Sequence, residues 1–81
     1  MNTKTMTAHV TIYSAAGCGQ CAATKRAFAR AGIEAELIDI TEAETVAAEL
    51  RAAGWRQLPV VAIDGEPQWA GFRPDLIAGV R

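Results

Sequence analysis

The chain has 81 residues, of which 51% are hydrophobic and 21% are charged, so it can form one small domain with a single core but no second domain. Its formal net charge of -1 gives no strong field of either sign, which argues against binding to nucleic acid or to an anionic membrane. No apolar run is long enough for a signal peptide or a membrane span, so we expect a cytoplasmic protein.

The first half of the domain begins with a strand and a helix. We expect residues 1–8 to form a loose tail and residues 9–81 to form the domain. The β-branched and aromatic run 9–14, "HVTIYS", predicts a buried parallel strand. The alanine-rich and basic run 22–31 predicts a helix that ends at Gly32.

A second strand and helix follow. Residues 34–40, "EAELIDI", predict the strand, and Thr41 and Glu44 have the spacing of a capping box at the start of the helix. Gly54 is expected to end that helix. Two strands joined through a helix predict a parallel pair with a right-handed crossover. The apolar positions that predict the helix are Ala43, Val46, Ala47 and Leu50.

The remaining elements are a hairpin and a short helix. Residues 59–64 and 66–70 predict two strands joined by an Asp-Gly turn, and Pro67 places the second strand at the sheet edge because proline lacks an amide hydrogen. Pro74 and Asp75 suit the first turn of a final helix. The predicted order is βαβαββα, in which the final helix packs inward through Leu76, Ile77 and Val80.

The only two cysteines lie three residues apart in "AAGCGQCAATKR". Cys18 falls at the N-terminus of the first helix, where free amides and the helix dipole favour the thiolate. Cys21 lies one turn further on, within reach of a disulfide. We therefore expect Cys18 to attack a target disulfide and Cys21 to resolve the mixed disulfide that forms.

Three non-catalytic functions of this pair fit the sequence less well than redox exchange. A tetrahedral zinc site needs four ligands, and outside the pair the chain offers only His9, at the far end of the first strand. A buried, inert pair is disfavoured by Gly17 and Gly19, which indicate an exposed loop. A structural disulfide is rare in a reducing compartment. Cys-x-x-Cys beside a βαβ pattern in a cytosolic protein is typical of redox function.

Leu58-Pro59 is the second informative feature. By itself Pro59 is a residue that opens a strand. Beside a redox pair, a cis bond between Leu58 and Pro59 would present the backbone of Leu58 to an incoming peptide that binds as an extended strand.

From His9 to Val80 the pattern resembles a thioredoxin fold of the short glutaredoxin type, an α/β fold with a four-stranded mixed sheet flanked by three helices. "CGQC", "GWRQLPVV" and "WAGFRPDLI" resemble the NrdH-redoxin family. That resemblance implies a thiol-disulfide oxidoreductase with no bound cofactor or metal. It would be reduced by thioredoxin reductase with NADPH and would donate electrons to the large subunit of class Ib ribonucleotide reductase.

The same resemblance assigns roles to individual residues. Cys18 and Cys21 would be the redox-active pair, and Asp75 matches the family's C-terminal segment. The sequence departs from the family's pattern at two positions that bear on the tuning of the redox potential. Gly19 stands where valine is commoner, and Ala70 stands in place of serine. The residues expected to bind partners are Gly19, Gln20, Leu58, Pro59, Trp69, Gly71, Phe72 and Arg73.

Phe72 argues against a glutathione-dependent glutaredoxin, because it replaces the second glycine of the turn that holds the tripeptide in that family. Trp69 suits either core packing or partner docking. Arg56 and Arg73 flank segments expected near the dithiol and suit docking of an acidic partner or stabilisation of the thiolate. Two further functions stay open, a redox-sensing binding module and a cluster-binding scaffold, and we expect a monomer.

Overall fold

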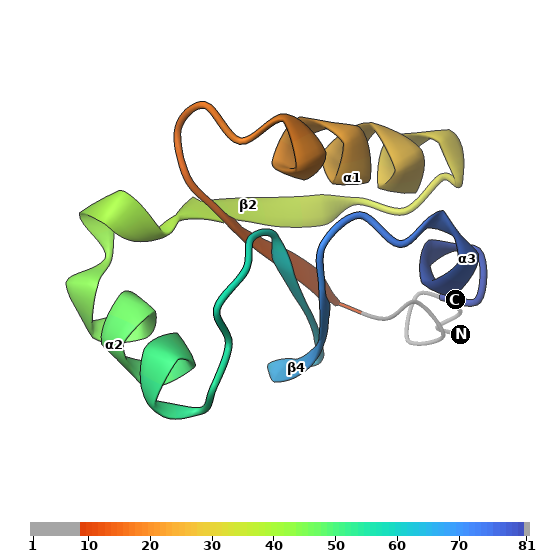
Figure 1. The fold of residues 1–81 in the computed structure, drawn as a ribbon. Coiled ribbons are helices and arrows are strands. Elements are labelled where there is room, and N and C mark those ends of the chain that lie inside the picture. The colour runs from red at the N-terminus through yellow and green to blue at the C-terminus, as the bar shows by residue number, and fades with distance from the viewer. Residues whose placement is uncertain (1–8, 81) are drawn as a thin grey trace.

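The computed structural model describes residues 9–80, so the tail predicted for residues 1–8 lies outside the described part (Figure 1). The elements follow the predicted order, with a short 3-10 turn added after the second strand. They are β1 (Val10–Ser14), α1 (Gly19–Arg30), β2 (Ala35–Asp39), η2 (Ile40–Glu42), α2 (Glu44–Ala52), β3 (Val60–Ile63), β4 (Glu66–Ala70) and α3 (Pro74–Ile77).

The four strands form one mixed sheet in the order β2-β1-β3-β4. β1 and β2 are parallel, with Val10 opposite Ala35, whereas β3 is antiparallel to both β1 and β4. The predicted parallel pair and the edge position of β4 are therefore confirmed. Pro67 lies beside a register shift between Val61 and Ala62, where a missing ladder hydrogen bond is tolerated.

Helices cover both faces of this sheet (Figure 1). α1 and α3 contact each other on one side, and α2 lies on the other. The main core fills the space beneath α1 and α3, where Phe28 is completely buried. The buried members of this core are Val10, Ile12, Phe28, Val61, Trp69, Ile77 and Val80.

α1 begins three residues before the predicted start at residue 22. Cys18 is its N-cap, and the Cys21 N–H donates to Cys18 Sγ over 3.1 Å. The helix can therefore include Gly19 and Gln20 despite the low helix propensity of glycine. At the other end the chain turns at Gly32, whose φ of 77° is accessible to glycine without steric cost.

The predicted capping box at Thr41 and Glu44 is wrong. Asp39 Oδ1 accepts hydrogen bonds from the Thr41 N–H at 2.9 Å and from the Thr41 hydroxyl at 2.6 Å. Thr41 is thereby held in η2, and α2 starts later from Ala43, which makes no side-chain cap. Asp39, two residues before Thr41, binds the threonine in an Asx turn, so the Thr41 hydroxyl does not cap α2.

The hairpin is confirmed, and the final helix is confirmed with one correction. Asp64 and Gly65 both have positive φ, at 53° and 86°, as the two-residue turn between β3 and β4 requires. Ile77 is buried, but Leu76 is 36% exposed and does not pack inward as predicted. Adjacent positions on a helix diverge by about 100°, so Ile77 faces the core and Leu76 does not, while Val80 is buried beyond the end of α3.

Candidate active site

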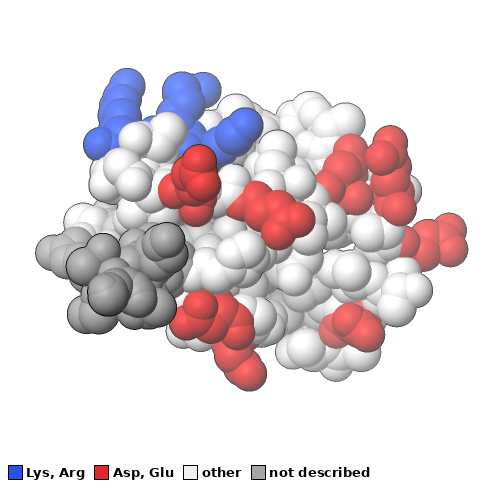
Figure 2. Space-filling model, turned by 180° about the vertical axis from the view of Figure 1, so that it is seen from behind, with Lys and Arg blue, Asp and Glu red and all other residues white. Residues whose placement is uncertain are grey.

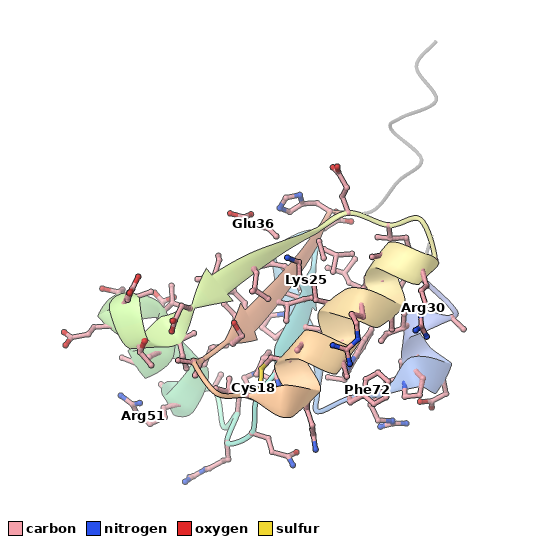
Figure 3. The ribbon with its side chains drawn as sticks, turned by 90° about the horizontal axis from the view of Figure 1, so that it is seen from above. Cys18, Lys25, Arg30, Glu36, Arg51 and Phe72 are labelled. Carbon is pink, nitrogen blue, oxygen red and sulfur yellow. A yellow bond between two sulfur atoms is a disulfide. The ribbon has the colours of Figure 1, made fainter. Side chains whose placement is uncertain are left out.

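Cys18 and Cys21 form a disulfide at the start of α1, with their Cα atoms 5.2 Å apart (Figure 3). Cys21 is buried at 3% exposure, whereas Cys18 is only partly buried. The N–H of Cys21 points at Cys18 Sγ, so a negative charge on that sulfur would be stabilised once the bond is reduced. The geometry therefore gives the two sulfur atoms unequal access to solvent.

A hollow of about 330 Å³ opens beside the disulfide. Its lining is mostly apolar and includes Leu37, which is 46% exposed on the edge strand β2. Lys25 is the charged side chain in this lining, one helical turn beyond Cys21. The sequence alone does not indicate this position of Lys25, because it depends on how α1 packs against β2.

The segment before β3 contains the expected cis bond between Leu58 and Pro59. Pro59 is fully buried, and its carbonyl accepts a hydrogen bond of 2.8 Å from the Gly71 N–H. Leu58 and Arg56 line a neighbouring groove of about 290 Å³ against α2. The start of β3 is thus bound directly to the turn that follows β4.

Three segments meet at Gly71, which is buried and has a φ of 89°. A Cβ at this position would lie 3.7 Å from Gln20 Oε1 and 3.9 Å from Gln57 Oε1. The Phe72 N–H donates to Gln20 Oε1 over 3.3 Å. Gln20, between the two cysteines, is therefore connected to the turn at residues 71–73.

Arg73 binds Asp75 through two hydrogen bonds, from Nε at 3.2 Å and from Nη2 at 2.9 Å. The hydrogen bond from Arg73 is the main cause that lowers the pKa of Asp75 below its ordinary value of 3.8. The same hydrogen bond raises the pKa of Arg73. The guanidinium is thus already engaged by a carboxylate of its own segment, whereas Arg56, three residues before Pro59, is exposed.

The comparisons with known proteins agree with this geometry. The sequence profile of the glutaredoxin family matches residues 10–67. The glutaredoxin-like protein NrdH of Escherichia coli K12 is 50% identical over 68 residues, which cover 84% of this chain and 83% of that protein. The corresponding Salmonella typhimurium protein is 48% identical over the same length. The chain belongs to the glutaredoxin family as an NrdH-type redoxin.

Solved structures show the same fold. The glutaredoxin-like protein NrdH-redoxin from Escherichia coli superposes with a TM-score of 0.83 at 44% identity, covering 90% of this chain and 95% of that chain. A glutaredoxin from Archaeoglobus fulgidus superposes with a TM-score of 0.72 at 21% identity, covering 99% of this chain and 94% of that chain. This NrdH-type redoxin is a thiol-disulfide oxidoreductase with the thioredoxin fold, and Cys18 and Cys21 are its cysteine pair.

Trp69 of this redoxin belongs to the core. Its side chain is 9% exposed and packs in the main cluster, and Trp69 pairs across the sheet with Val61. The indole Nε1 is buried without a hydrogen-bond partner. Of the two interpretations of Trp69, core packing is confirmed.

Gln57, whose side chain lies beside Gly71, was not singled out in the sequence. Only its place two residues before Pro59 could have indicated it.

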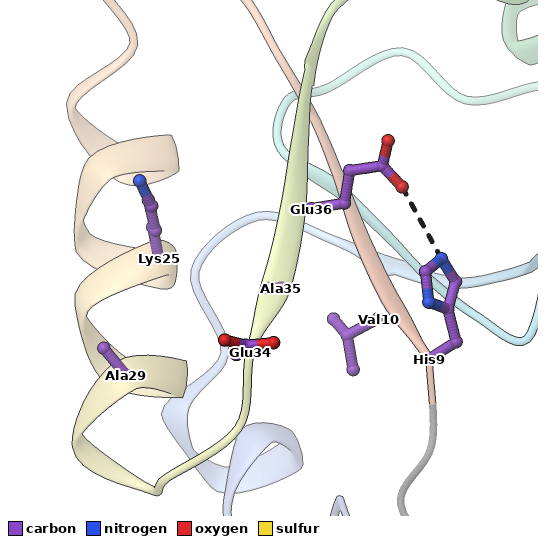
Figure 4. A pocket seen from close by; sticks show the side chains of 7 residues that line it. All are labelled: His9, Val10, Lys25, Ala29, Glu34, Ala35 and Glu36. Atoms are coloured by element: carbon purple, nitrogen blue, oxygen red, sulfur yellow. Dashed lines mark ion pairs between the residues drawn. The ribbon is translucent and has the colours of Figure 1, made fainter.

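His9 lies away from the cysteines, in a hollow of about 580 Å³ between α1 and β2 (Figure 4). His9 Nε2 is 3.5 Å from Glu36 Oε1, and Lys25 faces the same hollow. Within residues 9–80, no cluster of three histidine, cysteine or acidic side chains could hold a metal ion. No helix in this range is long and apolar enough to cross a membrane.

The charged residues within this redoxin's α1 are of one sign. Lys25, Arg26 and Arg30 are its charged residues, and α1 contains no acidic residue. In Figure 2 basic side chains gather at one edge, over α1, while acidic side chains spread across the rest of that face. A negatively charged surface could therefore approach the disulfide from the α1 side with favourable electrostatics.

Proposed function

We propose that this redoxin donates electrons to the large subunit of class Ib ribonucleotide reductase and is itself reduced by thioredoxin reductase with NADPH. The observation that carries the proposal is the close similarity to NrdH proteins together with the accessible Cys18–Cys21 disulfide. The solved Escherichia coli relative is described as having a thioredoxin-like activity profile, which supports the choice of reductase. A route that depends on NADPH also favours the cytoplasm.

The chemistry proceeds by two exchanges. The Cys18 thiolate attacks one sulfur of the client disulfide, which forms a mixed disulfide and releases the other client sulfur as a thiolate. The Cys21 thiolate then attacks Cys18 Sγ, releases the second client sulfur and leaves the Cys18–Cys21 disulfide. The client thus gains two electrons and, with two protons from water, two thiols.

The roles of the two cysteines follow from their environments. Cys18 is the more exposed sulfur and accepts the N–H of Cys21, so it suits the attacking thiolate. Cys21 is buried, so it suits the resolving thiol, which has only to reach Cys18. NADPH is used indirectly, because thioredoxin reductase passes its two electrons to the disulfide.

The partner-binding surface proposed here surrounds Cys18. Leu58 and Pro59 would present an extended backbone to the client segment, and Phe72, which is 38% exposed, offers an apolar contact. Trp69 would contribute by supporting this surface from the core. The full proposed set is Gly19, Gln20, Leu58, Pro59, Trp69, Gly71, Phe72 and Arg73.

The test measures NADPH consumption with a model disulfide in two parallel reactions. One contains thioredoxin reductase, and the other contains glutathione with glutathione reductase. We expect rapid turnover only with thioredoxin reductase, and no turnover with Cys18→Ser. Ribonucleotide reductase then replaces the model disulfide in the same assay. Rapid turnover only with glutathione would overturn the proposal in favour of a glutathione-dependent glutaredoxin.

A further inference from the structure

The cysteine expected to resolve the mixed disulfide lies where ionisation is opposed. Cys21 is buried on the inner side of α1, where this helix covers the sheet (Figure 1). A buried thiol loses its proton less readily than an exposed one, because the thiolate gives up its hydration. Resolution nevertheless needs the Cys21 thiolate, since only the thiolate attacks Cys18 Sγ. A hydrogen-bond donor beside Cys21 would therefore speed this step.

The strand β1 brings a buried hydroxyl to the same place. Successive residues of a strand face opposite sides of the sheet, so Ser14 shares its side with Val10 and Ile12. Those two residues pack with Phe28 in the main core, beneath α1. Ser14 is itself buried, and it lines the hollow of about 330 Å³ together with both cysteines. The Ser14 hydroxyl thus lies under the first turn of α1.

This hydroxyl is held only weakly in the oxidised protein. Ser14 Oγ donates to the Ile38 carbonyl over 3.4 Å, which is long for an O–H donor. A serine hydroxyl has one proton to donate and turns to suit its acceptor. A hydrogen bond to a charged sulfur is stronger than one to a distant neutral carbonyl. Ser14 can therefore change its acceptor when a thiolate forms beside it.

Other donors close to Cys21 are already engaged. The Cys21 N–H donates to Cys18 Sγ, and the Thr24 hydroxyl donates to the Gln20 carbonyl over 2.8 Å. Thr11 comes one residue before Ile12, so it faces the opposite side of the sheet, towards α2. The buried polar side chains within residues 9–80 are Thr11, Ser14 and Thr24.

Two charged groups border this part of the molecule. Lys25 lines the same hollow from α1 and is exposed. Asp39 lies opposite Ser14 in the parallel ladder, but its carboxylate binds Thr41. On the other side of β1, the strand β3 contributes only apolar residues. Lys25 is therefore the competing donor that an experiment has to separate from Ser14.

We propose that Ser14 is a positioning residue that acts through Cys21, by donating its hydroxyl hydrogen to Cys21 Sγ when the disulfide is open. The inference rests on the roles proposed for the two cysteines. In resolution, Cys21 loses its proton to solvent through the hollow, and its thiolate attacks Cys18 Sγ and releases the client sulfur as a thiolate. In the reverse direction, a reductant thiolate attacks Cys18 Sγ, and the same hydroxyl stabilises Cys21 as the leaving thiolate.

The experiment measures resolution directly. The fully reduced protein is mixed with an equimolar amount of dithiobis-nitrobenzoate, an aromatic disulfide that releases a coloured thiolate. Attack by Cys18 releases the first coloured thiolate, and resolution by Cys21 releases the second. The rate of the second phase is recorded from neutral to alkaline pH.

We expect Ser14→Ala to slow the second phase about tenfold near neutral pH, which is the effect of one hydrogen bond to a thiolate. The two rates should converge at alkaline pH, where Cys21 is ionised with or without the hydroxyl. Ser14→Thr keeps a hydroxyl and should retain the unchanged profile. Thr11→Val is the matched control, because it removes a buried hydroxyl from the opposite face of the same strand, and it should leave the second phase unchanged.

Several results would overturn the inference. Equal rates for Ser14→Ala and the unchanged chain near neutral pH would do so. A slowing of the same size at every pH would also do so, because a general structural change has that effect and a change in ionisation does not. The effect of Ser14→Ala should persist in a Lys25→Gln background, and its loss there would assign it to the ammonium group. The proposed cysteine roles fail separately, if the second phase is absent in the unchanged chain or persists in Cys21→Ser.

Discussion

At the scale of single residues, the two cysteines differ because α1 begins between them. Cys18 is the N-cap and stays partly exposed, whereas Cys21 lies on the inner side of the first turn. A disulfide between an exposed and a buried sulfur has one atom that a client can reach easily. The asymmetry assigns attack and resolution to different residues.

The first prediction tests that division. With a disulfide client, Cys21→Ser should accumulate a covalent adduct through Cys18, because no thiol remains to resolve it. Cys18→Ser should form no adduct. Intact-protein mass spectrometry under non-reducing conditions measures both. Adduct formation by Cys18→Ser through Cys21 would reverse the assignment.

The second prediction compares two phenylalanines. Phe28 is completely buried in the main core, so Phe28→Ala should lower the free energy of unfolding by about 3–5 kcal/mol. Phe72 is 38% exposed, and Phe72→Ala should change it by no more than about 1 kcal/mol. Urea unfolding of both variants is the measurement. Equal losses would mean that Phe72 packs more deeply than its exposure indicates.

The third prediction concerns Asp39, whose pKa is lowered from the ordinary 3.8 chiefly by the hydrogen bond from the Thr41 hydroxyl and then by that from the Thr41 N–H. A carboxyl whose pKa is lower in the folded state stabilises the fold above its unfolded pKa. That contribution is lost as the pH falls through the lower folded pKa. Asp39→Asn should therefore lower the melting temperature at neutral pH, and the difference from the unchanged chain should shrink below pH 3.8.

Melting curves recorded across this pH range provide the measurement. Glu42→Gln, at a neighbouring exposed carboxylate, is the control and should show a smaller difference at neutral pH. A difference between Asp39→Asn and the unchanged chain that grows as the solution becomes more acidic would contradict the prediction.

At the scale of elements, the two longer helices are attached to the sheet differently. α1 buries Cys21, Thr24 and Phe28, whereas α2 buries only Leu50. α2 packs chiefly against the short turn η2 rather than against a strand. Because buried apolar contacts hold a helix closed, α2 should open locally more often than α1.

The fourth prediction follows from this difference. Amide hydrogens of α2 should exchange with solvent at least about tenfold faster than those in the middle of α1, measured by hydrogen exchange at neutral pH. Leu50→Ala should speed exchange in α2 further while leaving α1 nearly unchanged, since Leu50 is outside the main core cluster. Equal protection of the two helices would show that they open as one unit.

At the scale of the whole molecule, most local patterns were predicted well, except for the capping box at Thr41 and Glu44, and the long-range contacts were not. The Asp64-Gly65 turn, the edge strand with Pro67 and the closely spaced cysteines depend on neighbours in the sequence. The exposure of Leu76 depends on which side of α3 meets the core. Since the partner of Gln20 comes from the opposite end of the domain, no local pattern indicates it.

The fifth prediction is that the protein is a monomer. The large apolar side chains exposed within residues 9–80 are Leu37, Phe72 and Leu76, which come from three different segments. A stable dimer buries about 800 Å² per partner, more than three partly exposed side chains supply. Light scattering after gel filtration should give the mass of one chain, and a doubled mass would refute this prediction.

The contact between Gln20 and Phe72 also orders events during synthesis. Both cysteines are synthesised about fifty residues before the turn at 71–73. The Cys18–Cys21 disulfide involves only the start of α1, whereas the contact of Gln20 needs the segment after β4. The two cysteines are therefore present in the growing chain before Gln20 can accept the Phe72 N–H.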